Sequence, residues 1–278
     1  MVFFAYKYKL SAELKTLFPA ILLDFFCKNH TIRKMTAQPQ TTAKELVDRL
    51  AGFARSEKTP SEFEIAAFKR ESKKLAKVDQ ARSDMCLGMI ACLEGNIEVC
   101  KKKHELSIRN GQEFEFHINY YASLIHLKRL YDANLCLENA LLLYPNNPEL
   151  ISEIMINSYF LGLYDKSLQY ADRLAKVDSG ILITDISSES KLVLDLGISI
   201  DSLYQAAKFI DEVCRNYSVK MDHVRLIQVE DGVLKWIETS TDVATTVAMN
   251  CDLFEKFAKA DDFDLGDFSV SFRSRAIG

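Results

Sequence analysis

The chain has 278 residues, of which 48% are hydrophobic and 27% are charged, a balance typical of a globular protein with one large or two small domains. Its net charge of −4 argues against a general nucleic-acid binder, because neutralising phosphates requires an excess of basic residues. The 7 cysteines are an odd number and include no Cys-x-x-Cys pair. We interpret them as buried free thiols of a soluble, cytoplasmic protein.

The first 40 residues differ in character from the rest of the chain. The apolar run from Leu17 to Cys27 contains Asp24 and is shorter than the roughly 20 residues that a membrane span requires. A signal peptide is an alternative, but no small-x-small cleavage site follows the run. Met35 opens a segment that resembles a natural N-terminus. We therefore expect residues 1–40 to be a disordered leader or the product of a mis-annotated upstream start, with no membrane association.

Helix signals dominate from residue 41 to residue 216. Thr42 and Glu45 have the spacing of a capping box, and Thr59 to Glu62 repeat it, with Pro60 at the first helical position. Apolar spacing then predicts three helix pairs, separated by turns at Gly95-Asn96, Lys128-Arg129 and Gly162-Leu163. The predicted helices are 81–93 with 96–110, 114–127 with 131–144, and 148–160 with 164–177.

These pairs recur with a regular period. Gly95 and Gly162 occupy equivalent turns two units apart, and the units then begin at Ala81, Phe114 and Pro148. The period is close to the 34 residues of a tetratricopeptide helix-turn-helix repeat. Such a unit buries its apolar face only by stacking on its neighbours. The alternative is a generic helical bundle in which the spacing is coincidental.

The chain resembles the tetratricopeptide repeat family over about residues 81–180. The matching residues are Leu87-Gly88 and Gly95-Asn96 in the first unit, Ala133, Leu137, Ala140 and Pro145-Asn146-Asn147 in the second, and Leu161 to Ser167 in the third. No unit has the family's tryptophan. Tyr121 and Met155 stand where the family has a small residue, and Ser179 replaces a closing proline. Residues 42–79 and 185–216 resemble degenerate leading and trailing units.

The pattern changes to two-residue alternation in residues 217–278. Asp231-Gly232 predicts a type I′ hairpin, in which Ile227 opposes Trp236 and Arg225 opposes Glu238. A helix is predicted at 242–259 and a third strand at 268–273; the apolar residues along one side of that helix are Val243, Val247, Phe254 and Phe257. The predicted fold class is therefore mainly α, a helical repeat solenoid over 41–216 followed by a small α+β module of β-β-α-β order over 217–278.

Motifs for catalysis are absent from the sequence. It has no phosphate loop, no nucleophile elbow and no His-Glu-x-x-His. His104 falls where the repeat expects a large core residue, so we expect a partly buried, hydrogen-bonded histidine and not a ligand or base. The acidic run Asp261 to Asp267 does not match a calcium loop, because it has no closing glutamate, and a solvated loop is the simpler interpretation. We predict no catalytic residue, no metal ligand and no cofactor, and expect that the chain is not an enzyme.

The resemblance implies a binding groove lined by the first helix of each unit. The family's groove positions fall on Arg82, Met85, Met89, Cys92, Glu115, Ile118, Ala122, Ile125, Glu149, Ser152, Ile156 and Tyr159. This set is apolar with a charged rim, which suits an amphipathic helix or an extended apolar peptide. The alternative is that these residues belong to the core. We expect an adaptor or chaperone that binds another polypeptide. An enzyme or metal-binding site in the C-terminal module is the alternative, and self-association is a third possibility.

Overall fold

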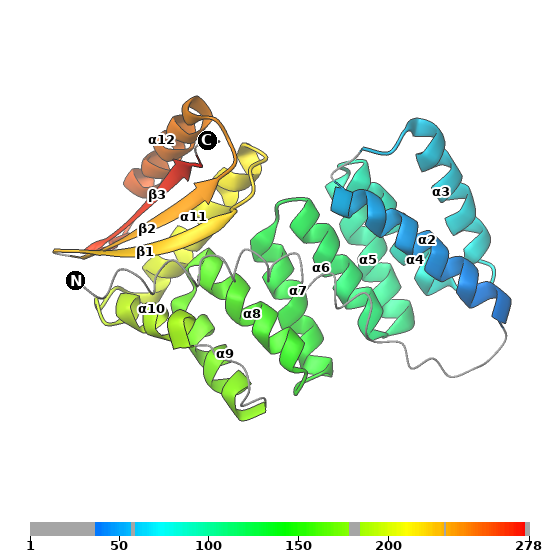
Figure 1. The fold of residues 1–278 in the computed structure, drawn as a ribbon, viewed down its shortest axis with the longest axis horizontal. Helices are drawn as coiled ribbons and strands as arrows, with labels where there is room; N and C mark the ends of the chain where they lie inside the picture. The colour runs from blue at the N-terminus through cyan, green and yellow to red at the C-terminus, as the bar shows by residue number, and fades with distance from the viewer. Residues whose placement is uncertain (1–36, 57–58, 178–183, 231, 276–278) are drawn as a thin grey trace. The chain divides into compact units, whose positions relative to one another are not determined.

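The computed structural model describes residues 37–56, 59–230 apart from 178–183, and 232–275, and the account below is confined to these. The predicted leader therefore lies almost wholly outside the described residues. Residues from Ala43 onward form one compact unit. The predicted fold class is confirmed: sequentially packed antiparallel helix pairs precede a β-β-α-β module (Figure 1). The domain boundary at residue 217 stays a prediction.

The three predicted helix pairs are present with nearly the predicted bounds. They are α4 (Gln80–Leu93) with α5 (Ile97–Gly111), α6 (Phe114–His126) with α7 (Leu130–Leu143), and α8 (Pro148–Leu161) with α9 (Tyr164–Val177). Gly95 and Gly162 have φ of +71° and +92°, the left-handed region in which glycine is unstrained. The side chains of Asp79, Asn96 and Asn147 cap the N-termini of α4, α5 and α8.

Within the described residues two helices precede the pairs, and their predicted starts need correction. Helix α2 (Ala37–Ser56) begins before Thr42, so the capping box predicted at Thr42 is wrong. Helix α3 (Glu62–Leu75) has a capping box two residues later than predicted, between Ser61 and Glu64. Pro60 consequently precedes the cap instead of opening the helix. Both helices pack together through Phe53 and Phe68, whose ring centroids are 5.8 Å apart.

The trailing helices α10 (Thr184–Leu194) and α11 (Ile200–Asn216) are present around the turn at Gly197. Helix α11 packs on α7 and α8. The Asp211 carboxylate accepts a hydrogen bond from the Tyr131 amide at 3.2 Å, and the Tyr204 hydroxyl donates to Asp165 at 2.9 Å. Helix α11 therefore brings the chain back along the repeats before the sheet begins.

The sheet has the order β1-β2-β3, formed by β1 (His223–Val229), β2 (Gly232–Thr239) and β3 (Phe268–Ser274). Strands β1 and β2 are antiparallel, and β3 is parallel to β2. The predicted hairpin register is wrong by two residues, because Arg225 opposes Trp236 and His223 opposes Glu238. A shift of two residues leaves every side chain on its predicted face. Arg225 still reaches Glu238 diagonally, with 3.0 Å between Nε and Oε1.

Gly232 explains that shift. It lies within β2 rather than in the turn, and a Cβ at this position would stand 2.0 Å from the Asp267 carbonyl oxygen. The Val233 amide donates to the same carbonyl at 2.8 Å. The glycine is required by the close approach of the chain entering β3, not by a left-handed turn conformation.

Helix α12 (Val243–Lys259) packs against β3 and α11. The Asn250 side-chain amide donates to the Phe272 carbonyl at 2.9 Å and accepts from the Phe272 amide at 2.8 Å. It thereby satisfies both backbone polar groups of one residue at the edge of the sheet. Towards α11, the ring of Phe257 packs on Phe209 and stacks on Phe263 at 4.8 Å.

One buried lysine connects the sheet to the helix pairs. Lys235 on β2 is fully buried, and its Nζ donates to the Phe160 carbonyl near the end of α8 at 2.9 Å. The ammonium lies 5.6 Å from the centre of the Tyr164 ring, and Gly162 leaves room for it, because a Cβ there would be 2.9 Å from Nζ. Desolvation lowers the pKa of Lys235 to about 7. None of the described helices has the length and apolarity to cross a membrane.

Candidate binding face of the first helices

The three helix pairs follow one another in chain order (Figure 1). Helix α4 packs on α6, and α8 packs on α10. Between α6 and α8, the Tyr121 hydroxyl donates to the Glu153 carboxylate at 3.0 Å. We call the surface made by α4, α6 and α8 the first-helix layer. Its polar links join residues about one repeat apart in the chain.

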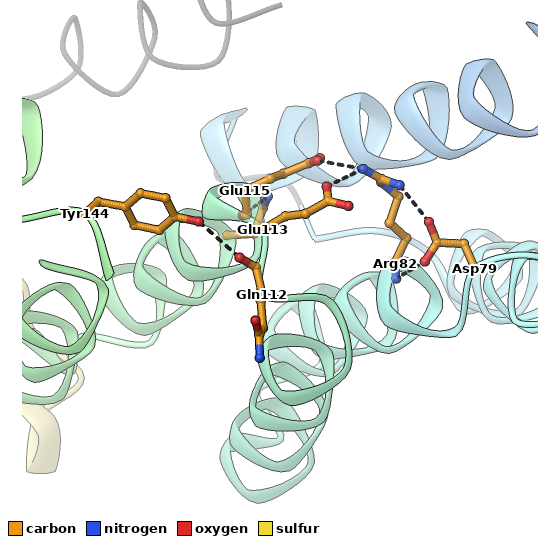
Figure 2. A network of polar contacts seen from close by, with 7 residues as sticks. Asp79, Arg82, Gln112, Glu113, Glu115 and Tyr144 are labelled. Carbon is orange, nitrogen blue, oxygen red and sulfur yellow. Dashed lines mark hydrogen bonds and ion pairs between the residues drawn. The ribbon is translucent and has the colours of Figure 1, made fainter. Parts of the chain in front are cut away.

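Arg82 on α4, in the preceding pair, contacts residues at the N-terminus of α6. Its guanidinium donates to Asp79 at 2.7 Å and to Glu113 at 2.6 Å, and lies 3.6 Å from Glu115. Figure 2 shows these carboxylates converging on the one arginine. Three acidic side chains around a single cation leave this end of the layer with a net negative charge.

A residue of the next helix also contacts the connection between α5 and α6 (Figure 2). The Tyr144 hydroxyl of the following helix donates to the Gln112 carbonyl at 3.0 Å. Gln112 has a φ of +52°, which a residue other than glycine adopts at some cost in strain. Contacts from Arg82 and Tyr144 thus fix the direction in which α6 leaves α5. The direction of α6 in turn determines which of its side chains lie on the surface of the first-helix layer.

A second polar group lies in the middle of the layer, between α6 and α8. Beside its bond to Glu153, the Tyr121 hydroxyl accepts from the Asn157 side-chain amide at 3.4 Å. Desolvation raises the pKa of the Glu153 carboxyl to about 7, and the Tyr121 bond opposes that rise. Glu153 therefore changes charge near neutral pH. In the sequence Tyr121 is only a departure from the family's small residue, whereas in the structure its hydroxyl reaches the next first helix.

The predicted groove residues do not share one environment. The buried members are Met85, Met89, Cys92, Ile156 and Tyr159. The half-buried members are Arg82, Glu115, Ile118, Ala122, Ile125 and Ser152, and the exposed member is Glu149. The Tyr159 hydroxyl donates to Glu189 of α10, and the Cys92 thiol donates to the Ser123 carbonyl at 3.4 Å. The accessible apolar part of the layer is therefore on α6, while the flanking residues of α4 and α8 mostly form its support.

Ile118, Ala122 and Ile125 form this accessible strip. Their spacing of four and three residues places them on one side of α6. Glu115 stands one turn before them, and Glu149 is exposed on the next first helix. Chemically, the strip offers dispersion and hydrophobic contact, and the carboxylates offer partners for cations. It contains no nucleophile paired with a base.

The other residues singled out from the sequence have structural surroundings. His104 is fully buried, its Nε2 lies 2.9 Å from the Ser123 hydroxyl, and its ring stacks on Tyr120 at 5.0 Å, which confirms the expected core histidine. Asp264 in the acidic loop accepts from the Gly266 amide at 2.8 Å. In the described part of the chain, no group of three or more histidine, cysteine, aspartate or glutamate residues is placed to hold a metal ion.

The described cysteines carry free thiols. Five are buried, namely Cys86, Cys92, Cys100, Cys136 and Cys214, whereas Cys251 is exposed. Cys27 lies outside the described residues.

Comparisons with protein-family models, with curated proteins and with solved structures find no match. The assignment of the site therefore depends on the geometry of this chain alone.

Proposed function

We propose that the chain binds a segment of another polypeptide on its first-helix layer, as an adaptor or chaperone with tetratricopeptide-like repeats. Three consecutive helix pairs of nearly equal length support the repeat assignment, as do turns at equivalent positions, the packing of α4 on α6 and the hydrogen bonds of Tyr121 to α8. The single observation that carries the proposal is the strip of Ile118, Ala122 and Ile125. These apolar side chains are only half-buried, although they lie between two well-packed neighbours.

The charge around the strip specifies the kind of segment. Arg82 is already surrounded by carboxylates, and Lys103 pairs with Asp84 at 2.7 Å. Glu115 on α6 and Glu149 on α8, both in the predicted groove set, add negative charge to the layer. A helix or extended segment with apolar residues against α6 and lysine or arginine on its flanks would satisfy both features. We therefore propose a basic amphipathic segment as the ligand.

A photo-crosslinking experiment tests the site directly. Benzoylphenylalanine is introduced at Ile118, and the purified chain is irradiated with fluorescent peptides that share one apolar pattern but carry either basic or acidic flanks. We expect covalent capture of the basic peptide and little capture of the acidic one. The control places the same group at Leu142, which is 80% exposed on α7. Equal capture at both positions, or no preference for basic flanks, would contradict the proposal.

A double substitution tests whether the strip is a surface or a core. Ile118→Asp with Ile125→Asp places two carboxylates on α6, and desolvating each against an apolar ligand costs several kcal/mol, about enough to abolish micromolar binding. We expect loss of peptide binding with an unchanged helical melt in circular dichroism, and Leu142→Asp should change neither. A collapsed melt for the double variant would instead show that these residues stabilise the core.

A further inference from the structure

Helix α12 presents an apolar face to solvent. Val243, Val247 and Phe254 are 68%, 56% and 52% exposed, and Cys251 is exposed between them. Their spacing places the four on one side of the helix, and Ala244, Ala248 and Ala258 are exposed beside them. The sequence predicts an apolar side containing Val243, Val247, Phe254 and Phe257. In the structure only Phe257 packs inward, against Phe209 and Phe263.

The inward side of α12 is already occupied. Thr246, Met249 and Leu253 are buried. The helix's charged residues are also partly engaged there, because Lys256 pairs with Glu212 of α11 at 2.8 Å. The exposed apolar residues thus form a stripe between the buried side of the helix and a charged side that carries Asp252, Glu255 and Lys259. This apolar stripe is separate from the first-helix layer.

We propose that α12 pairs with α12 of a second copy of this chain, antiparallel across a two-fold axis that passes beside Cys251. An interface of this symmetry must be complementary to itself. Antiparallel pairing about Cys251 places Phe254 against Ala248 of the second copy and Ala244 against its Ala258. Each aromatic side chain then meets a small residue, and the backbones approach closely at the ends.

The charges on this face favour a second copy over an unrelated partner. The exposed Asp242 caps the N-terminus of the helix, and the exposed Lys259 lies at its C-terminus, where it pairs with Glu255 one turn earlier. Antiparallel pairing brings each Asp242 close to the Lys259 of the other copy, at both ends of the interface. It also sets the positive end of each helix dipole against the negative end of the other. A parallel pair would place like charges together.

The size of the face sets the strength of the association. A helix of 17 residues is about 25 Å long, and one helix pair buries an area at or below the low end of specific interfaces. The two copies should therefore exchange, with a dissociation constant on the order of micromolar. Sedimentation velocity of the full chain should show a monomer at low concentration and a dimer at roughly 100 µM.

Disulfide trapping tests the axis. In a Cys27→Ser background, oxidation with copper phenanthroline should link two chains through Cys251, because a disulfide requires Cα atoms within about 7 Å. Moving the thiol with Val247→Cys and Cys251→Ser separates the two thiols by about 12 Å along the helices, so this variant should not link to itself. Mixing it with a Glu255→Cys, Cys251→Ser chain should restore a link, since residues 247 and 255 then face each other. Self-linking at residue 247 would overturn the antiparallel arrangement.

A surface substitution tests whether the face is the interface. Phe254→Glu replaces an exposed side chain and should leave the helical melt unchanged, while weakening dimerisation at least tenfold. Leu142→Glu is the matched control, since Leu142 is an exposed apolar residue on α7, and it should leave the dimer intact. A chain that stays monomeric at all concentrations overturns the proposal, as does a dimer that Phe254→Glu leaves unchanged.

Discussion

The helix pairs of residues 80–177 and the sheet module of residues 223–274 are stabilised by contacts of different range. In the pairs, polar links join residues about one unit apart: Arg82 and Glu113 are 31 residues apart, and Tyr121 and Glu153 are 32 apart. In the module, the Lys235 ammonium donates a hydrogen bond to the Phe160 carbonyl, 75 residues away in the chain. The Asp264 amide donates to the Ser202 hydroxyl, 62 residues away.

This difference predicts how the stability of each region responds to a substitution. In the pairs, stability should be approximately a sum of neighbouring terms, so a substitution weakens one junction and spares the others. The module depends on a long-range link to the turn between α8 and α9, so a change on either side of that link affects both. The chain's single tryptophan, Trp236, lies on β2 and reports on the module, while far-ultraviolet circular dichroism reports mainly on the helices.

The largest effect is expected from the buried lysine as pH changes. The pKa of Lys235 is about 7 in the folded chain against 10.5 ordinarily, so between these values the unfolded chain binds more protons. Stability from this group therefore rises as pH rises from about 7 to about 10, by on the order of 4 kcal/mol. Lys235→Met should abolish that rise in urea unfolding followed by Trp236 fluorescence. A variant with the wild-type pH slope would show that Lys235 is not desolvated.

A somewhat smaller effect is expected at the start of β2. Gly232→Ala forces a Cβ against the Asp267 carbonyl oxygen, which is backbone and yields only if β3 moves. We expect a loss of about 3 kcal/mol in the fluorescence transition, with a smaller shift in the dichroism transition. Gly52→Ala is the control, because nothing lies within 4 Å of its Cβ, and it should stabilise helix α2 by about 0.5–1 kcal/mol. Equal shifts of both transitions would contradict the contrast between the two regions.

Within the pairs, Tyr121→Phe should cost about 1–2 kcal/mol, because it leaves the Glu153 carboxylate without its hydroxyl donor. The pKa of Glu153 is raised from 4.5 to about 7, so the folded chain binds more protons between these values. Its contribution to stability is present at low pH and is lost as pH rises through about 7. Glu153→Gln should remove this loss in thermal melts followed by dichroism. Tyr144→Phe, which removes a more exposed bond to Gln112, should cost less than Tyr121→Phe.

The smallest effect is expected where the second helices meet. Lys166 of α9 pairs with Glu138 of α7 at 2.8 Å, with both side chains partly exposed. A double-mutant cycle of Lys166→Met and Glu138→Gln should give a coupling energy of less than about 1 kcal/mol, reduced further by salt. A coupling as large as that of the Tyr121 link would show that the two layers are held equally strongly.

The sequence predicted the helix pairs closely, because period, turn glycines and N-caps are local signals. It placed Gly95, Asn96 and Gly162 in the right turns, and it identified the β-β-α-β order from the change of periodicity. It could not predict that β3 would run parallel to β2, since strand direction depends on how α12 crosses the sheet. The hairpin register failed because Gly232 serves a tertiary contact that no local pattern reveals.

The candidate site was predictable only in part. The resemblance placed the candidate site on the first helices, but it could not separate buried Met85 and Ile156 from half-buried Ile118, because a small rotation of a helix decides burial. The burial of Lys235 could not be predicted from the sequence, since a lysine in an alternating strand normally lies on the solvent side. Likewise, the sequence grouped Val243, Val247, Phe254 and Phe257 on one side of α12, whereas only Phe257 among them packs inward.

The bond pair between Asn250 and Phe272 has a consequence for aggregation. A strand with free amides and carbonyls at the edge of a sheet is a template on which other chains can add strands. By occupying both polar groups of Phe272, Asn250 interrupts the ladder that an incoming strand would need at the middle of β3. A side chain from a helix thus protects this edge against the addition of further strands. In other proteins prolines, β-bulges or charged residues protect such edges.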